Sequence, residues 1–198
     1  MGNNKGKKFP AEVLTPDEVR RLLKSCDRRS VSGVRAKAMI MILYRGGLRC
    51  SEMLDLRKSD LNQDSCTVRI RHGKGDLART VGVDSSVFDV VETWVRRRKE
   101  LELKRESPLF CSRHGRKLPG QYVRKLCTRL GARASIEKRV HPHGFRHTLA
   151  SELCQEGVPL TVIQAQLGHL SAATTDQYLR QLSPTQVIET MKTRNWVA

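Results

Sequence analysis

Apolar residues recur at helical spacing through most of the chain, and turn residues separate the segments that carry them. The first segment begins at Thr15, where the run Thr-Pro-Asp-Glu forms a capping box with proline at the first helical position. A second, 35–44, is apolar on most faces, which predicts a helix in the middle of the core that stops at Gly46. Further helical patterns cover 121–130, 146–156, 159–167, 171–182 and 183–198.

Between residues 66 and 83 the period changes from helical to two. Apolar and polar residues alternate in two short runs, whose apolar members are Cys66, Val68, Ile70, Val81 and Val83. The turn residues at 72–76 lie between the runs, so the pattern predicts a β-hairpin with Lys74 near its tip. A helix capped by Ser85 or Ser86 follows and is closed by the basic run 96–99. We expect a mainly α fold (α+β) with a small antiparallel sheet at one edge.

The length of 198 residues suits one folded domain, expected over 15–198 with a C-terminal helix at 183–198. Residues 1–14 are rich in Gly, Asn and Lys, and we expect a flexible leader or linker there. The longest apolar run, 38–44, is far shorter than the roughly 20 residues that span a bilayer. With no secretory signal at the N-terminus, the expected compartment is the cytoplasm.

Charge narrows the class of partner. The chain has 37 Lys and Arg against 20 Asp and Glu, a net charge of +17, which favours a polyanion and above all nucleic acid. A ribosomal or chromatin-type binder, or a basic surface without a specific ligand, would carry the same charge. The cysteines form no CxxC pair and are expected to be reduced and buried, not disulfides or zinc ligands; they are Cys26, Cys50, Cys66, Cys111, Cys127 and Cys154.

Polar groups stand in a recognisable order in the segments GGLRCSEMLDL, the hairpin tip, HPHGFRHTLAS and LGHLSAATTDQYLR. In chain order they are Arg49, Glu52, Lys74, His143, Arg146, His169 and Tyr178. From about residue 13 to 191 the sequence resembles the tyrosine recombinase and phage integrase family. The resemblance implies an active site made of all these residues except Glu52, which would hold Arg49 in place without contacting the substrate itself.

The chemistry of phosphodiester cleavage agrees with these residue types. A catalyst must supply on the order of 20 kcal/mol, and Arg49 and Arg146 can grip phosphate oxygens with planar forks of donors. The phenol of Tyr178 is almost wholly protonated at neutral pH, so a base is needed, and a neutral His143 can accept the proton. Lys74 can protonate the leaving 5′ oxygen, and His169 can hydrogen-bond the phosphate. This scheme requires no metal and no cofactor.

The histidines could also be read as a zinc site, and the other tyrosines as nucleophiles. His141, His143 and His147 have spacings found in zinc sites, but no fourth ligand is near and Arg146 would place a cation against the metal. His147 is expected to be a buried, hydrogen-bonded neighbour that shapes the loop. Tyr44 and Tyr122 follow apolar patterns and are expected to be packing residues, not nucleophiles.

The function implied by the resemblance is site-specific DNA recombination through a 3′-phosphotyrosine intermediate. A type IB topoisomerase and a non-catalytic DNA-binding module are the alternatives. The expected partners are double-stranded DNA and other protomers, with a tetramer in synapsis and a monomer alone, at the nucleoid. The N-terminal core-binding domain usual in this family is expected to be absent. The helix at 183–198 either docks on a neighbouring protomer or folds back on its own domain.

Overall fold

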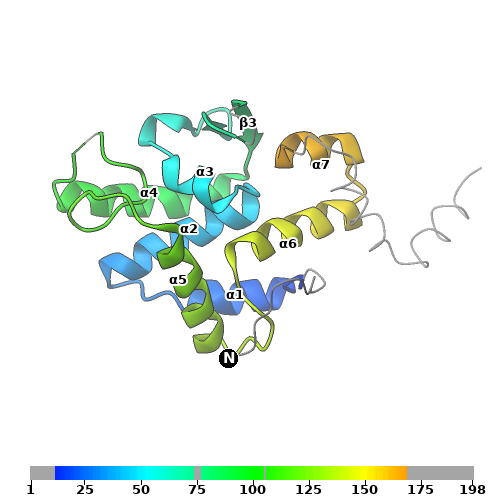
Figure 1. Ribbon diagram of the computed structural model, residues 1–198, viewed down its shortest axis with the longest axis horizontal. Helices are drawn as coiled ribbons and strands as arrows, with labels where there is room; N and C mark the ends of the chain where they lie inside the picture. The colour runs from blue at the N-terminus through cyan, green and yellow to red at the C-terminus, as the bar shows by residue number, and fades with distance from the viewer. Residues whose placement is uncertain (1–11, 74–76, 105, 169–198) are drawn as a thin grey trace, which may run out of the picture.

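The computed structural model describes residues 12–73, 77–104 and 106–168, which are helical apart from one small sheet (Figure 1). The expected mainly α fold with an antiparallel sheet is confirmed. The elements are α1 (Pro16–Lys24), α2 (Val31–Arg45), α3 (Cys50–Asp55), a 3-10 turn (Lys58–Asp60), β1 (Leu61–Asn62), β2 (Thr67–Ile70), β3 (Arg79–Gly82), α4 (Ser85–Glu100), α5 (Gly120–Arg133), α6 (Pro142–Gln155) and α7 (Leu160–Leu167). The helices expected at 171–182 and 183–198 lie outside the described residues.

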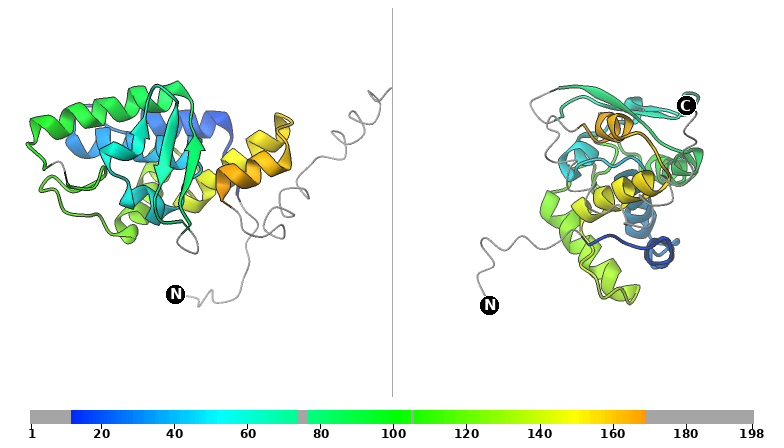
Figure 2. Two further views of the ribbon diagram at one scale, coloured as in Figure 1. Left: turned by 90° about the horizontal axis from the view of Figure 1, so that it is seen from above. Right: turned by 90° about the vertical axis from the view of Figure 1, so that its right-hand side faces the viewer.

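Helix α2 forms the centre of the core, as its apolar pattern predicts. Most of its 15 residues are buried, and α4 and α6 pack along it. Trp94 of α4 is fully buried, and its Nε1 donates to the carbonyl of Leu109 at 2.8 Å, which ties the following loop to the core. The sheet lies at one end of the molecule, and α1 and α5 lie at the other (Figures 1 and 2). The C-terminal end of α2 therefore fixes the segment that carries Arg49.

The sheet has three antiparallel strands in the order β1-β2-β3, one more than the predicted hairpin. Val68 of β2 lies opposite Val81 of β3, and both side chains are buried. Cys66, predicted to be in the strand, lies in the turn before it with φ 51°, although its carbonyl still accepts a hydrogen bond from Val83 N at 3.0 Å. Strand β1 has two residues, too few for alternation to reveal it in the sequence.

Helix α2 begins at Val31, four residues before the predicted start, and three further helices also differ from the sequence prediction. Helix α6 begins at Pro142, four residues earlier than expected, so His143 lies in its first turn and not in a loop. The N-cap of α4 is Asp84 and not one of the two serines after it, and its carboxylate accepts a hydrogen bond from Arg45 Nε at 2.6 Å. Helix α3 has no counterpart in the prediction because six residues are too few to display a helical period.

The packed chain extends to the N-terminal side of Thr15. Leu14 is 3% exposed, and its N–H donates to Thr148 Oγ1 of α6 at 3.1 Å. The carbonyl of Val13 accepts a hydrogen bond from Lys138 Nζ at 3.0 Å. Residues 12–14 therefore pack with the domain, whereas the rest of the predicted leader, 1–11, lies outside the described residues.

All six cysteines are free thiols. Three of them, Cys26, Cys111 and Cys127, are buried as expected, whereas Cys50, Cys66 and Cys154 are only half-buried. Across residues 12–73, 77–104 and 106–168, no helix combines the length and apolar character that crossing a membrane requires.

Helix α7 and the second half of α6 form a separate apolar cluster, made of Leu149, Ala150, Ile163 and Leu167. Gly47, in the turn between α2 and α3, has φ 63° and lies directly against this cluster. A Cβ at Gly47 would come within 2.7 Å of Leu167 Cδ2 and 2.9 Å of Leu149 Cδ2. The turn therefore requires glycine both for its backbone conformation and for the close approach of α7.

Replacing Gly47 by alanine should destabilise the fold. We expect Gly47→Ala to lower the free energy of unfolding by about 2–4 kcal/mol, because backbone strain and overpacking add. Gly157→Ala is the matched control: its φ is 77°, but nothing lies within 4 Å of the added methyl, and about 1 kcal/mol is expected. Urea unfolding of both variants measures the difference, and equal losses would show that the contact with α7 has no energetic weight.

Candidate active site

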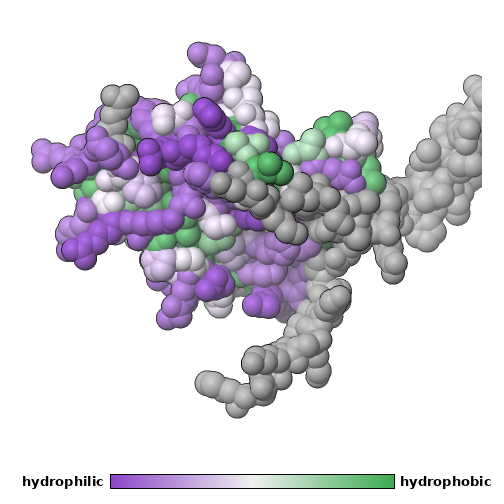
Figure 3. Space-filling model, turned by 45° about the horizontal axis from the view of Figure 1, so that its top comes forward, coloured by the Kyte–Doolittle hydropathy of each residue, from purple (hydrophilic) through white to green (hydrophobic). Residues whose placement is uncertain are grey.

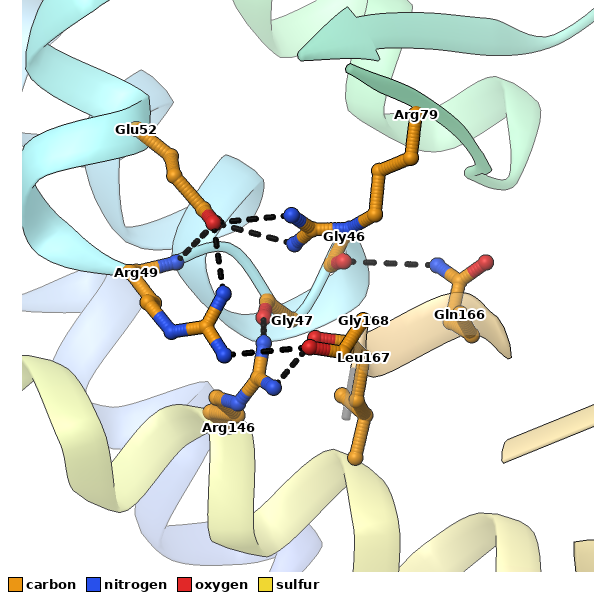
Figure 4. A network of polar contacts seen from close by, with 9 residues as sticks. All are labelled: Gly46, Gly47, Arg49, Glu52, Arg79, Arg146, Gln166, Leu167 and Gly168. Atoms are coloured by element: carbon orange, nitrogen blue, oxygen red, sulfur yellow. Dashed lines mark hydrogen bonds and ion pairs between the residues drawn. The ribbon is translucent and has the colours of Figure 1, made fainter. Parts of the chain in front are cut away.

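Arg146 of α6 lies at the base of the site and is 1% exposed. Its Nη1 donates to the carbonyl of Gly47 at 2.6 Å, and its Nη2 donates to the carbonyl of Leu167 (Figure 4). One guanidinium thereby joins α6 to the turn after α2 and to the end of α7. These bonds fix the plane of the guanidinium, as two-point recognition of an oxyanion requires.

Arg49 precedes α3 and lies beside Arg146. Its Nη2 donates to the carbonyl of Gly168 at 3.1 Å, next in the chain to the carbonyl that Arg146 Nη2 binds. Glu52 holds Arg49 at two points, because its carboxylate accepts hydrogen bonds from the backbone N of Arg49 at 2.7 Å and from Nη1 at 2.8 Å. The turn before α3 places Arg49, and α6 places Arg146, so that the two guanidiniums lie side by side (Figure 4).

Arg79 of β3 was not among the sequence candidates. Its two terminal nitrogens donate to the two oxygens of Glu52 at 2.8 and 2.9 Å. Burial alone would raise the pKa of Glu52, but hydrogen bonds from Arg79 and Arg49 and the charge of Arg79 outweigh it, and the pKa lies below its ordinary value. Glu52 is therefore ionised at neutral pH. Together with Arg146, the site holds three guanidiniums and one carboxylate, which leaves an excess of positive charge (Figure 4).

Gln166 of α7 is a second residue that the sequence did not reveal. Its Nε2 donates to the carbonyl of Gly82 at 2.8 Å and to that of Gly46 at 3.3 Å, and its Oε1 accepts a hydrogen bond from the N–H of Gly82 at 3.1 Å. The side chain therefore pairs with the backbone of β3 as a neighbouring strand would. This contact docks α7 onto the sheet beside the guanidiniums.

His143 lies one turn before Arg146 on α6, exposed on the surface. Its pKa lies below the ordinary histidine value, first because neighbouring groups remove part of its hydration and then because of the charges of Arg146, His141 and Arg49. Its ring meets that of His147 edge-on, with centroids 4.3 Å apart. His147 lies on the helix as predicted, but it is half-buried and not buried. A neutral His143 at pH 7 is chemically a proton acceptor.

A cavity of about 810 Å³ opens beside Arg49 and His143, between α3 and the N-terminal ends of α5 and α6. Its charged lining residues are Arg49, Asp55, Lys117, Arg124 and Arg139, and Asp55 is paired with Lys117. Arg146 is not among the residues that line this cavity. Hydrophilic side chains dominate the described surface in Figure 3. The lining charges suit an anion.

His141, His143 and His147, whose spacings are found in zinc sites, are not grouped as metal ligands in the described part of the chain. Among the residues that the structure describes, no three His, Cys, Asp or Glu side chains are grouped closely enough to hold a metal ion. The ring of His141 instead packs on Gly144, where a Cβ would come within 2.7 Å of its Nδ1. The close approach of this ring explains the glycine in the first turn of α6.

Three sequence candidates, Lys74, His169 and Tyr178, lie outside the described residues. The other two tyrosines are engaged elsewhere, as expected of packing residues. Tyr44 OH donates to Glu152 at 2.5 Å, and burial together with this bond raises the pKa of Tyr44 to about 12. Tyr122 OH accepts a hydrogen bond from Arg35 at 2.6 Å. Both phenols are thus bound to partners other than Arg49 and Arg146.

The sequence matches the Phage integrase family over residues 12–183. Tyrosine recombinase XerD of Staphylococcus aureus is 34% identical over 174 residues, which are 87% of this chain and 58% of that protein. The crystal structure of XerA recombinase superposes with a TM-score of 0.79 at 25% identity, covering 98% of this chain and 68% of that one. XerH site-specific recombinase, bound to palindromic difH substrate in a post-cleavage complex, has a TM-score of 0.76 at 26% identity, covering 96% and 55%.

The chain thus spans less than two thirds of the length of the curated relatives it matches. The matched range includes both arginines, the glutamate and the histidine of the site described above. This chain therefore belongs to the phage integrase family.

Proposed function

We propose that this chain is the catalytic domain of a site-specific DNA recombinase that cuts and rejoins DNA through a 3′-phosphotyrosine intermediate. The observation that carries the proposal is the pairing of Arg49 and Arg146, which donate to consecutive carbonyls at the end of α7, beside a cavity lined by cations. Two planar donors at one point match the charge that develops on a phosphate under attack.

In the proposed reaction, Tyr178 Oη attacks the scissile phosphorus and the bond to the 5′ oxygen breaks. The phenolic proton passes to His143, and Lys74 gives a proton to the leaving 5′ oxygen. Rejoining reverses these steps with the 5′ hydroxyl of another strand, so the bond energy is kept without ATP. His169 hydrogen-bonds the phosphate.

The arginines bind the non-bridging oxygens in this scheme. Arg49 already faces the cavity. For Arg146, a phosphate oxygen would bind N–H groups beside those given to the carbonyls of Gly47 and Leu167, or replace one of these carbonyls. Binding phosphate is favourable because its oxygens carry a full negative charge, whereas a carbonyl oxygen carries only a partial one.

The proposed partners are double-stranded DNA and further protomers, with a tetramer in synapsis and a monomer alone. XerH, a structural neighbour, has been solved with its difH substrate. We assign the catalytic domain to 15–198, with residues 12–14 packed at its N-terminal edge and 183–198 as its C-terminal helix. Because DNA is the substrate, we place the reaction at the nucleoid, in the cytoplasm.

The pH dependence of cleavage should report on His143. The reaction needs the neutral imidazole, so the rate rises with pH through the pKa of His143 and then levels off. Since that pKa is lowered, the plateau should be reached at a lower pH than an unperturbed histidine would give. Single-turnover cleavage across pH measures this.

The matching variant is His143→Gln, which should slow cleavage by about a hundredfold and remove the acid limb of the profile. His114→Gln, in an exposed loop, should leave both unchanged. An acid limb that persists in His143→Gln would assign the titrating base to another residue.

The function itself is tested by covalent capture on nicked duplexes whose binding arms are randomised. The wild-type chain should form a protein–DNA band that survives denaturation and disappears on proteolysis. A DNA-binding module would give no such band. Relaxation of supercoiled plasmid that lacks any selected site would indicate a type IB topoisomerase instead.

A further inference from the structure

The proposed reaction gives no role to Arg79, although this residue is bound to Glu52 in the site. We propose that Arg79 is a positioning residue, which balances the charge of Glu52 and thereby holds Arg49 in place against the scissile phosphate. This inference rests on the proposed function. It is carried by the contacts that Arg79 shares with Arg49.

Both side-chain partners of Arg49 are also partners of Arg79. Glu52 accepts hydrogen bonds from both arginines: the guanidinium of Arg79 contacts both carboxylate oxygens, whereas that of Arg49 contacts only Oε1. Gly168, whose carbonyl accepts from Arg49, lies flat on the Arg79 side chain: a Cβ at Gly168 would come within 2.7 Å of Arg79 Nε and 2.8 Å of its Cζ. Arg79 therefore supports the two groups that hold the Arg49 guanidinium.

The charges explain why a second arginine is needed. Glu52 is almost fully buried, and with Arg49 as its sole counter-ion it would neutralise the charge that the phosphate is to meet. The fork from Arg79 satisfies both oxygens of Glu52. The field of Arg49 is then directed outward, where its side chain is 27% exposed.

Arg79 acts through these groups and does not reach the substrate itself. Its side chain is 14% exposed, and both terminal nitrogens are bound to Glu52. On β3 it is in phase with the buried Val81, so it points to the core side of the sheet. A positioning role follows, as distinct from phosphate contact.

The test compares Arg79→Met with Arg98→Met. Arg98 is 7% exposed and donates to backbone carbonyls in the loop after α4, so its loss is a matched change in a buried arginine. The readouts are single-turnover cleavage at saturating DNA, DNA affinity and Tm. Arg79→Met should cleave about a hundredfold more slowly with affinity unchanged within about threefold. Arg98→Met should lower Tm but cleave at the wild-type rate.

A double variant separates positioning from simple structural support. In a Glu52→Gln background there is no carboxylate charge to balance, so adding Arg79→Met should slow cleavage by less than about threefold. The inference is overturned if Arg79→Met cleaves as fast as Arg98→Met, or if its effect is equally large in both backgrounds.

Arg79→Lys is the conservative variant at this position, and the covalent band of the wild-type chain tests the proposed function separately. If Arg79→Met does not fold, Arg79→Lys, which keeps the charge but loses the fork, should fold and cleave about tenfold more slowly. A wild-type rate in Arg79→Lys would contradict the inference. Absence of the covalent band in the wild-type chain would instead count against the proposed function.

Discussion

Arg146→Ala is expected to slow DNA cleavage about a thousandfold at saturating DNA. Arg146 supplies a fixed fork of donors in a buried setting, where its interaction with developing phosphate charge is strongest. Arg146→Lys should recover little of the rate, since an ammonium keeps the charge but cannot make the two-point contact. Single-turnover cleavage on a duplex selected by covalent capture gives the rates.

The chemical origin of the loss can be tested on the substrate. A methylphosphonate at the scissile position is neutral and needs less cationic stabilisation, so the deficit of Arg146→Ala relative to wild type should shrink on it. Arg21→Ala is the control: Arg21 also donates to two backbone carbonyls, of Ala134 and Ser135, away from the site, and its loss should not slow cleavage. An unchanged deficit on the neutral substrate would show that Arg146 acts only by holding the fold.

Glu52→Gln should produce the largest loss of stability in the site. Replacing the buried carboxylate leaves Arg49 and Arg79 without their counter-ion, which costs about 3–5 kcal/mol. Glu100→Gln makes the same chemical change in an exposed ion pair with Arg97, where at most about 1 kcal/mol is expected. Urea unfolding at neutral pH gives both values.

The difference in stability between wild type and Glu52→Gln should depend on pH, because the pKa of Glu52 is lowered in the folded protein. Because the pKa of Glu52 is lowered in the folded state, its stabilisation is present above the unfolded-state pKa and is lost as pH falls through the folded-state pKa. The gap in stability between wild type and Glu52→Gln should therefore narrow in acid. A constant gap from neutral to acidic pH would mean that the carboxylate charge contributes nothing.

Elements that cover at least two periods of their own repeat could be predicted, whether that period is two residues in a strand or about 3.6 in a helix. Helix α2 and the β2–β3 hairpin show this clearly. Short elements could not be, since α3 and β1 are too brief to display a period. The early start of α6 was readable, because Pro142 stands at a first helical position as Pro16 does in α1.

In the candidate site, too, some residues could be predicted from the sequence, whereas their tertiary contacts could not. Local motifs identify Arg49, His143 and Arg146, but the acceptors of the two arginines do not follow from any motif: Arg146 binds a carbonyl 99 residues away, and Arg49 one 119 residues away. Arg79 had a detectable signal, a charged residue in phase with buried Val81, yet its partner depends on tertiary packing. Such contacts require the coordinates.

In the proposed reaction, the phenol of Tyr178 becomes joined to DNA. The most direct test is mass spectrometry of the peptide that keeps a nucleotide after covalent capture, proteolysis and nuclease digestion. We expect a 3′-phosphate ester on Tyr178 and no captured DNA with Tyr178→Phe, which should still bind the duplex. Attachment to Tyr44 or Tyr122, or capture that persists in Tyr178→Phe, would contradict it.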